Sequence, residues 1–208
     1  MTKRLRPCRA FAAAAVYLLL IACLYGCIVS VAFDVSFYEQ TPPFDAMAEE
    51  IVSYLSGKLP ALSQTLFGEQ ERLHMADVLG LFRTGKTVAL GALALGILFL
   101  ARALFARGDA HTFATGFAMG FALFALPFLA MGVFAAVDFT AWFTAMHRLV
   151  FRNELWLFDG SSPLIQMMPE SFFAGAVGRI CARFAVCAAV LCALFWLLPS
   201  TVARLKKG

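Results

Sequence analysis

Long apolar stretches alternate with polar segments along the chain. Four stretches are apolar for about 20 residues, the length at which a helix crosses a hydrocarbon core of roughly 30 Å. They cover about residues 10–33, 86–106, 112–137 and 176–200. Helices are expected because an unpaired backbone amide in hydrocarbon costs several kcal/mol. The sequence therefore predicts an all-α polytopic membrane protein, with residues 1–208 forming one membrane domain that contains four transmembrane helices.

The first polar segment, residues 34–85, is too long for a simple connection and carries periodic apolar residues. Between Asp45 and Leu59, apolar side chains recur on one stripe: Ala48, Ile51, Val52, Leu55 and Leu59. This spacing predicts an amphipathic helix on the membrane surface. A second helix is predicted from about Glu69 to Arg83, continuing into the second span, because acidic residues in its first turn suit the helix dipole.

Phenylalanines recur every three or four residues through the third span, at positions 113, 117, 121, 124 and 128. At this spacing the rings share one helix face. The stripe has two interpretations, a packing face for another helix or the lining of a groove for lipid chains. Pro127 in the same span is expected to kink the helix.

Composition and charge add an orientation to this picture. The chain is 62% hydrophobic and only 14% charged, which indicates that the membrane is its solvent. Basic residues cluster before the first span, between the second and third, and after the fourth: Lys3, Arg4, Arg6, Arg9, Arg102, Arg107, Arg204, Lys206 and Lys207. By the positive-inside rule both termini are predicted to be cytoplasmic. Residues 34–85 and 138–175 then form an extracellular helical cap, and the net charge of +4 gives no reason to expect nucleic acid.

The cysteines allow two interpretations. All six lie in the cytoplasmic tail or the spans, which favours small apolar packing residues over disulfides. Leu20-Ile21-Ala22-Cys23 also fits the short pattern that precedes a lipidated cysteine, so the first span has an alternative as a cleaved lipoprotein signal. The apolar run that continues to Phe33 favours a retained span.

Two histidines are the candidate catalytic residues. The first is His74, in the predicted helix at 69–83. His74 and Asp77 are three residues apart and so share a helix face, where a carboxylate can orient an imidazole. An ordinary surface helix, with both side chains in water, explains the same spacing.

The second histidine, His147, lies in the second polar segment. On a helix it shares a face with Phe143 and Phe151, near the headgroup boundary. An aromatic belt at the membrane interface accounts for the aromatic residues without an active site. It accounts less well for a titratable side chain among them.

The order of these features resembles a known family. The motifs that carry the resemblance are His74-Met-Ala-Asp-Val78 ahead of the second span, Met146-His-Arg-Leu-Val-Phe-Arg-Asn-Glu-Leu-Trp156, Asp159, Leu164-Ile165, and Pro169-Glu-Ser-Phe-Phe173 before the fourth span. The chain is similar over nearly its whole length to the lipoprotein intramolecular transacylase family, Lit.

The resemblance implies an enzyme of the bacterial plasma membrane with its active site at the extracellular face. Its substrates would be diacylglyceryl-modified lipoproteins, held in membrane lipid. It would move the sn-2 acyl chain to the α-amine of the same cysteine, giving an N-acyl S-monoacylglyceryl lyso-form. The two family histidines correspond to His74 and His147, acting as general acid and base, and no cofactor is implied.

Further residues are expected to bind or confine the substrate. Ester and amine belong to one molecule and must close a ring of about eight atoms, so orientation matters. Tyr38, Phe143, Phe151 and Trp156 are candidates for a confining wall, Asp77 for orienting His74, and Asn153 and Asp159 for placing the head group.

Three alternatives remain at this stage. A zinc site built from His74, Asp77, Glu71 and His147 would suit a membrane hydrolase, although the usual His-Glu-x-x-His helix is absent and no metal is required. A non-catalytic membrane protein whose outer cap binds a lipid or protein partner is the rival of another class. A channel is disfavoured, because the spans lack rings of polar residues.

Overall fold

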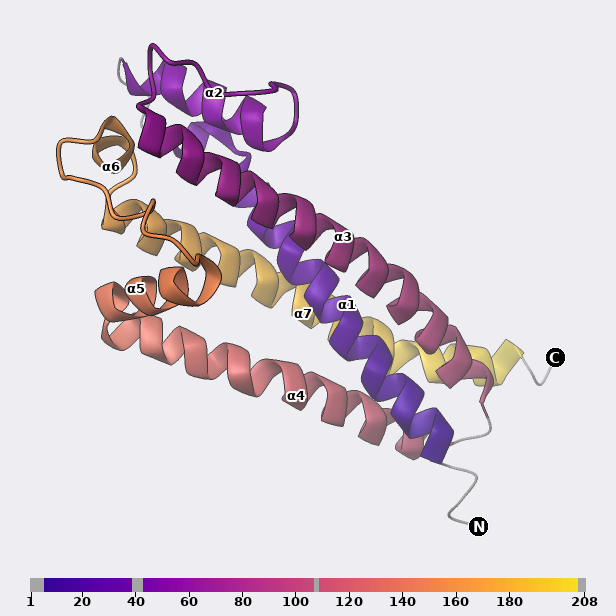
Figure 1. The fold of residues 1–208 in the computed structure, drawn as a ribbon. Coiled ribbons are helices and arrows are strands. Elements are labelled where there is room, and N and C mark those ends of the chain that lie inside the picture. The colour runs from indigo at the N-terminus through magenta and orange to yellow at the C-terminus, as the bar shows by residue number, and fades with distance from the viewer. Residues whose placement is uncertain (1–5, 39–42, 107–108, 206–208) are drawn as a thin grey trace. The chain divides into compact units, whose positions relative to one another are not determined.

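The structure is a computed structural model that describes residues 6–38, 43–106 and 109–205 (Figure 1). All regular secondary structure in these ranges is helical. Four helices are long and apolar enough to cross a membrane. They are α1 (Arg6–Ala32), α3 (Glu69–Phe105), α4 (Ala110–Val137) and α7 (Glu170–Leu205). The prediction of an all-α protein with four transmembrane helices is confirmed. Of the basic residues used to predict orientation, Lys3, Arg4, Arg107, Lys206 and Lys207 lie outside the described ranges.

The shorter elements come from the two polar segments. They are η2 (Val35–Phe37), α2 (Phe44–Leu55), α5 (Phe139–Val150) and α6 (Pro163–Met167). The predicted helix at 69–83 is the first part of α3, which continues without a break into the apolar stretch, as expected. Likewise α4 stays helical through Pro127, and a kink there stays a prediction.

The end of α2 differs from the sequence prediction. The helix ends at Leu55, not Leu59, because Gly57 adopts a left-handed conformation with φ of 82°. The amides of Lys58 and Leu59 then both bond to the carbonyl of Ser53, which closes the helix end. The predicted apolar stripe is buried as far as Leu55, whereas Leu59 is exposed.

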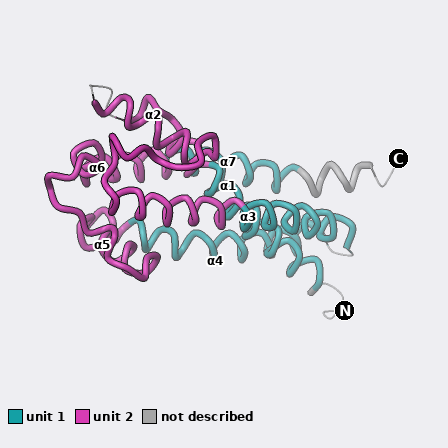
Figure 2. The backbone as a smooth tube through the Cα atoms, turned by 45° about the horizontal axis from the view of Figure 1, so that its top comes forward, with its two compact units in different colours: residues 1–26, 87–132, 182–208 teal, residues 27–86, 133–181 magenta. Residues whose placement is uncertain are grey.

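The chain divides into two compact units, coloured separately in Figure 2. Unit 1 comprises residues 1–26, 87–132 and 182–208. Within it, the phenylalanine stripe of α4 contacts rings of α7: Phe113 and Phe117 lie against Phe195, and Phe124 and Phe128 against Phe184. These contacts support the packing interpretation of the stripe.

Unit 2 comprises residues 27–86 and 133–181 and contains both polar segments. Its core is formed by the buried face of α2, by Met75 and Leu79 of α3, and by Leu164 and Met167 of α6. The side chain of Glu50 on α2 accepts hydrogen bonds from the backbone and hydroxyl of Ser63 and so fixes the loop before α3. The residues with candidate chemistry all belong to this unit.

Candidate active site

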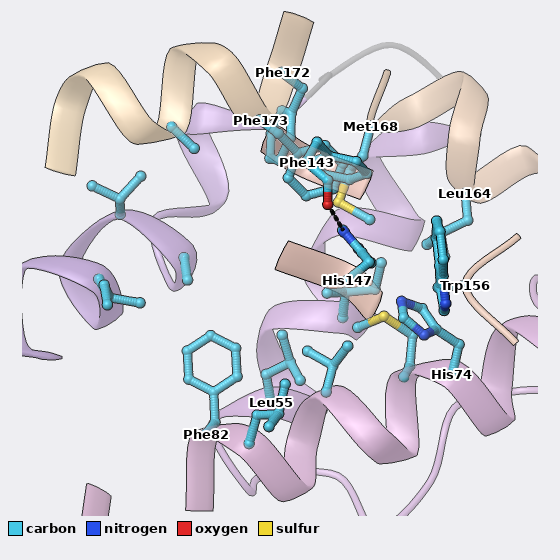
Figure 3. Close-up of a pocket in the computed structure, with 18 of the residues that line it drawn as sticks. Leu55, His74, Phe82, Phe143, His147, Trp156, Leu164, Met168, Phe172 and Phe173 are labelled. Carbon is cyan, nitrogen blue, oxygen red and sulfur yellow. Dashed lines mark hydrogen bonds between the residues drawn. The ribbon is translucent and has the colours of Figure 1, made fainter. Parts of the chain in front are cut away.

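Unit 2 has a partly open, apolar cavity of about 290 Å³ that both candidate histidines line (Figure 3). Its lining comes from the end of α1, from η2, α2, α3, α5, α6 and the start of α7, and from the loop between α5 and α6. The polar side chains in this lining are His74, His147, Tyr38 and Trp156. An apolar cavity with a few convergent polar groups is typical of a site for an apolar ligand.

The two imidazoles lie close together in the lining of this cavity. Their ring centroids are 6.4 Å apart and the ring planes are 27° from parallel. His74 lies in the second turn of α3, and His147 in the last turn of α5. Both side chains are buried, with 7% and 8% of their surface exposed. Residues 73 positions apart in the sequence thus share one site.

The hydrogen bond of His147 assigns the tautomer of its neutral ring. Nδ1 lies 2.8 Å from the carbonyl oxygen of Phe143, one turn earlier in α5 (Figure 3). A carbonyl only accepts, so Nδ1 donates, and Nε2 of the neutral ring keeps its lone pair. Burial lowers the pKa of His147 below its ordinary value, and the bond to Phe143 opposes this only in part. His147 is therefore a neutral base at physiological pH.

His74 is held by aromatic rings instead of a polar partner. Its ring centroid lies 5.0 Å from that of Phe151 and 5.4 Å from that of Phe158. Its Nδ1 is buried and has no hydrogen-bond partner within the described ranges. A buried polar atom without a partner is costly in a structural core, and here it is available to a substrate.

The residues expected to confine the substrate are at the cavity. Phe143 packs against His147 with ring centroids 4.0 Å apart, Trp156 at 5.0 Å and Phe151 at 5.5 Å. Tyr38 lines the same cavity and donates its hydroxyl to the carbonyl of Ala32 at 2.8 Å. Burial raises the pKa of Tyr38 to about 12, so its hydroxyl stays protonated.

Asp77 is hydrogen-bonded to a residue other than His74, and its role in orienting His74 stays a prediction. Its carboxylate accepts a hydrogen bond of 2.9 Å from the side chain of Asn153. The two α3 residues share a face, as expected, but the ring of His74 turns into the aromatic cluster while Asp77 reaches the loop after α5. Spacing along a helix does not by itself determine the partner of a carboxylate, because segments distant in sequence also offer hydrogen-bond donors once the chain folds.

Asn153 and Asp159 are not among the residues that line the cavity. Asn153 holds the loop together with two hydrogen bonds. Its backbone carbonyl accepts from Trp156 Nε1 at 3.0 Å, and its side-chain oxygen accepts from the backbone amide of Leu155 at 3.1 Å. It thereby fixes the tryptophan that packs on His147. Asp159 is exposed and accepts from the amide of Ser161 at 2.8 Å.

Glu71 has a role that the sequence analysis missed. Its carboxylate, 5% exposed, accepts from the amides of Gly68 at 2.8 Å and Leu164 at 3.1 Å, and from the hydroxyl of Ser162. The bond to Gly68 is the helix-start contact expected of a glutamate at the third position of a helix. The other two tie α6 to the turn of α3 that precedes His74. The capping pattern was present in the sequence, but the contacts 91 and 93 residues away were not.

The zinc alternative requires carboxylates that the fold uses elsewhere. Asp77 bonds to Asn153, and Glu71 bonds to the start of α6. No group of three or more potential ligands for a metal ion occurs among the residues described. The geometry therefore lends this alternative no support.

Comparison with known proteins identifies the family. The family model for lipoprotein intramolecular transacylase Lit matches residues 13–173. The chain belongs to the Lit family. This match includes both histidine motifs, and it makes the chain a multi-pass membrane protein of a transacylase family whose substrates are lipoproteins.

Solved Lit structures share the fold at low sequence identity. A Bacillus cereus Lit variant in which a histidine is replaced by arginine is 19% identical, with a TM-score of 0.75 over 96% of this chain and 94% of that one. The variant with alanine in place of a histidine is 18% identical, with a TM-score of 0.73 over 97% and 96%. A third structure of the same enzyme gives 18% and 0.71 over 100% and 99%. No curated protein sequence matches the chain significantly.

Proposed function

We propose that the chain transfers the sn-2 acyl group of a diacylglyceryl-cysteine lipoprotein to the α-amine of the same cysteine. The product is a lyso-form lipoprotein with an N-acyl and an S-monoacylglyceryl group. Membership of the Lit family supports the class of reaction. The observation that carries the proposal is the pair of buried imidazoles, 6.4 Å apart, in an apolar cavity.

The reaction is balanced within one molecule. The amine nitrogen attacks the ester carbonyl carbon and forms an amide C–N bond, while the bond from that carbon to the glyceryl oxygen breaks. The amine loses one proton and the glyceryl oxygen gains one, so the mass of the lipoprotein does not change. The reaction requires a base, an acid and an imposed geometry, and a covalent intermediate on the enzyme is not needed.

We assign the base role to His147 and the acid role to His74. Nε2 of His147 has a free lone pair, because Nδ1 is committed to the carbonyl of Phe143. It accepts the proton from the attacking amine. His74 lines the same cavity beside His147 and supplies a ring N–H to the ester carbonyl and then to the leaving oxygen. The proton on His147 then passes to His74 at the end of the cycle, so both rings are again neutral.

The cavity contributes by confinement and by excluding water. The ring that forms during attack, counted from the amine nitrogen through Cα, Cβ, sulfur and two glyceryl carbons to the ester, has about eight members. A free lipopeptide rarely closes such a ring. The walls formed by Phe143, Phe151 and Trp156 restrict the glyceryl group, and the apolar setting favours the neutral, nucleophilic form of the amine.

We place the reaction at the extracellular face of the bacterial plasma membrane. The segments that form the cap, 34–85 and 138–175, carry nearly all the acidic residues, and clusters of basic residues flank the spans at their other ends. Lipidated cysteines of secreted lipoproteins would be presented on that face.

Single histidine substitutions test the assignment. His74→Ala and His147→Ala are each expected to abolish formation of the N-acyl product, measured by tandem mass spectrometry of a synthetic diacylglyceryl-cysteine peptide incubated with the purified protein. The exposed third histidine, His111 at the start of α4, provides the control His111→Ala, which is expected to retain activity. Full activity of either cavity variant would remove that histidine from the mechanism. A substrate that keeps its free amine with the unaltered protein would favour the rival hypothesis of a binding cap.

A further inference from the structure

A second hollow in unit 2 lies outside the histidine cavity. It is formed by two open cavities of about 390 and 580 Å³ that share Glu69 and Gln70, at the start of α3. The first cavity is lined by residues 64–71 and part of the loop from 158 to 163. The second also includes Leu73 and residues 153–155. We call the two together the Gln70 groove.

Only one layer of chain separates the Gln70 groove from the histidines. The side-chain amide of Gln70 donates to the carbonyls of Leu155 and Leu157, at 3.1 and 3.0 Å, and so fixes this layer. Phe158, the next residue, lines both the groove and the histidine cavity, and its ring centroid is 5.4 Å from that of His74. The groove therefore begins where the wall of the reaction cavity ends.

The groove is acidic. Glu69, Glu154 and Asp159 line it with exposed carboxylates, and no lysine or arginine is among the residues that line either cavity. Glu71 also lines it but spends its carboxylate on backbone and hydroxyl groups of the fold. The hydrogen bonds from Ser161 lower the pKa of Asp159, which therefore carries a negative charge at physiological pH.

The proposed reaction requires a path for polypeptide. The reacting cysteine is the first residue of its lipoprotein, so its α-amine reaches the histidines while its carbonyl continues into a polar chain. Such a chain cannot remain in an apolar cavity of about 290 Å³ without leaving its backbone groups unpaired. It must continue over the polar surface next to the cavity, and the Gln70 groove lies there, because Phe158 lines both.

From this juxtaposition we propose that the Gln70 groove binds the polypeptide immediately after the lipidated cysteine and prefers basic side chains there. This inference rests on the proposed function. An extended chain advances about 3.3 Å per residue. The ring of Phe158, which lines the groove, is 5.4 Å from that of His74, so a chain that starts at His74 reaches the groove within its first few residues. Complementary charge raises capture of the substrate more than it alters the chemical step.

Two lipopeptides that differ only after their second residue test the groove. Both begin with diacylglyceryl-cysteine and serine, followed by four lysines in one and four glutamates in the other. In neutral detergent at low salt, KM is expected to be roughly tenfold lower for the lysine peptide, with similar kcat. The combined variant Glu69→Gln, Glu154→Gln, Asp159→Asn should bring the two KM values together, because the three substitutions remove charge but keep hydrogen-bonding groups.

The control substitutes a carboxylate elsewhere in unit 2. Glu49→Gln on the exposed side of α2 removes one charge away from the groove and should keep the preference. Equal KM values with the unaltered protein, or a preference that remains in the combined variant, would contradict the proposal that the groove binds the peptide. Binding of fluorescent forms of both peptides to the His147→Ala variant measures the same preference without turnover, so a failure of the proposed reaction remains distinguishable from a failure of the groove.

Discussion

At the scale of single residues, the site depends on how two imidazoles are held. His147 has one nitrogen bonded to its own helix, which leaves the other as an acceptor. His74 is surrounded by rings and keeps a buried nitrogen without a partner among the residues described. Burial favours the neutral form of both rings. In the neutral state each ring carries one N–H that can donate and one nitrogen that can accept.

The state of His147 predicts a pH dependence. Burial lowers the pKa of His147, so in the free protein its ring should stay neutral at pH 6.5, the ordinary histidine value, and gain a proton only at lower pH. Loss of the base by protonation should then remove activity as the pH falls through this lowered value. Nitrogen-15 NMR of histidine-labelled protein, assigned with His147→Ala, measures both the pKa and the tautomer. A ring that is mainly charged at pH 6.5, or protonated at Nε2 when neutral, would contradict the role of base.

The partner of Asp77 predicts an unequal effect of two substitutions. If Asp77 serves mainly to anchor Asn153, Asp77→Asn should reduce kcat by no more than about threefold, because an amide oxygen still accepts the bond. Asn153→Ala should reduce kcat by about tenfold or more, because it removes the side-chain bonds to Asp77 and to the amide of Leu155 and so loosens the loop that holds Trp156 against His147. Turnover of a diacylglyceryl lipopeptide measures both. A severe loss in Asp77→Asn with a mild one in Asn153→Ala would instead support the orientation of His74 by Asp77.

At the scale of elements, the site depends on helix ends. His147 lies in the last turn of α5, whose first turn is fixed to α7 by a hydrogen bond of 2.6 Å from Thr140 to Glu170. His74 lies just after the first turn of α3, where Glu71 also holds the start of α6. Periodicity predicted α3 and the aromatic face around His147. It did not predict that Glu71 would join three segments, because such contacts depend on how distant segments pack.

Close packing of α1 and α4 predicts a specific sensitivity in unit 1. A Cβ at Gly116 would lie 2.3 Å from the carbonyl oxygen of Arg9, and one at Gly120 would lie 2.1 Å from that of Ala13. Gly116→Ala and Gly120→Ala should therefore each destabilise the protein by about 1–3 kcal/mol. Thermal unfolding in detergent measures the loss.

The matched control for this packing is in the same helix. Gly132→Ala places its Cβ in open space, with nothing within 4 Å, and should be neutral or slightly stabilising because alanine favours a helix. Equal unfolding midpoints for all three variants would show that α1 and α4 do not approach as closely as the structure indicates.

At the scale of the whole molecule, the sequence predicted the membrane environment, the four spans and the family. Long apolar runs indicate the first two, and two local histidine motifs indicate the third. It predicted less of the site. Phe158 lies in a loop and lines the cavity only because the chain from Asn153 to Leu157 is hydrogen-bonded to α3. The end of α2 was missed because the left-handed turn at Gly57 overrode an apolar stripe that continued to Leu59. Most features of the site that periodicity did not predict depend on contacts between segments that are distant in the sequence.

Mass spectrometry of a crossed labelling experiment tests the proposed reaction most directly. Two diacylglyceryl-cysteine peptides are mixed with the purified protein, one with a deuterated sn-2 acyl chain and the other with a heavy-isotope peptide. Each is expected to become N-acylated at unchanged mass, with its own chain and no exchange of labels. Products that combine the deuterated chain with the heavy peptide would contradict intramolecular transfer, and two unaltered free amines would contradict acyl transfer altogether.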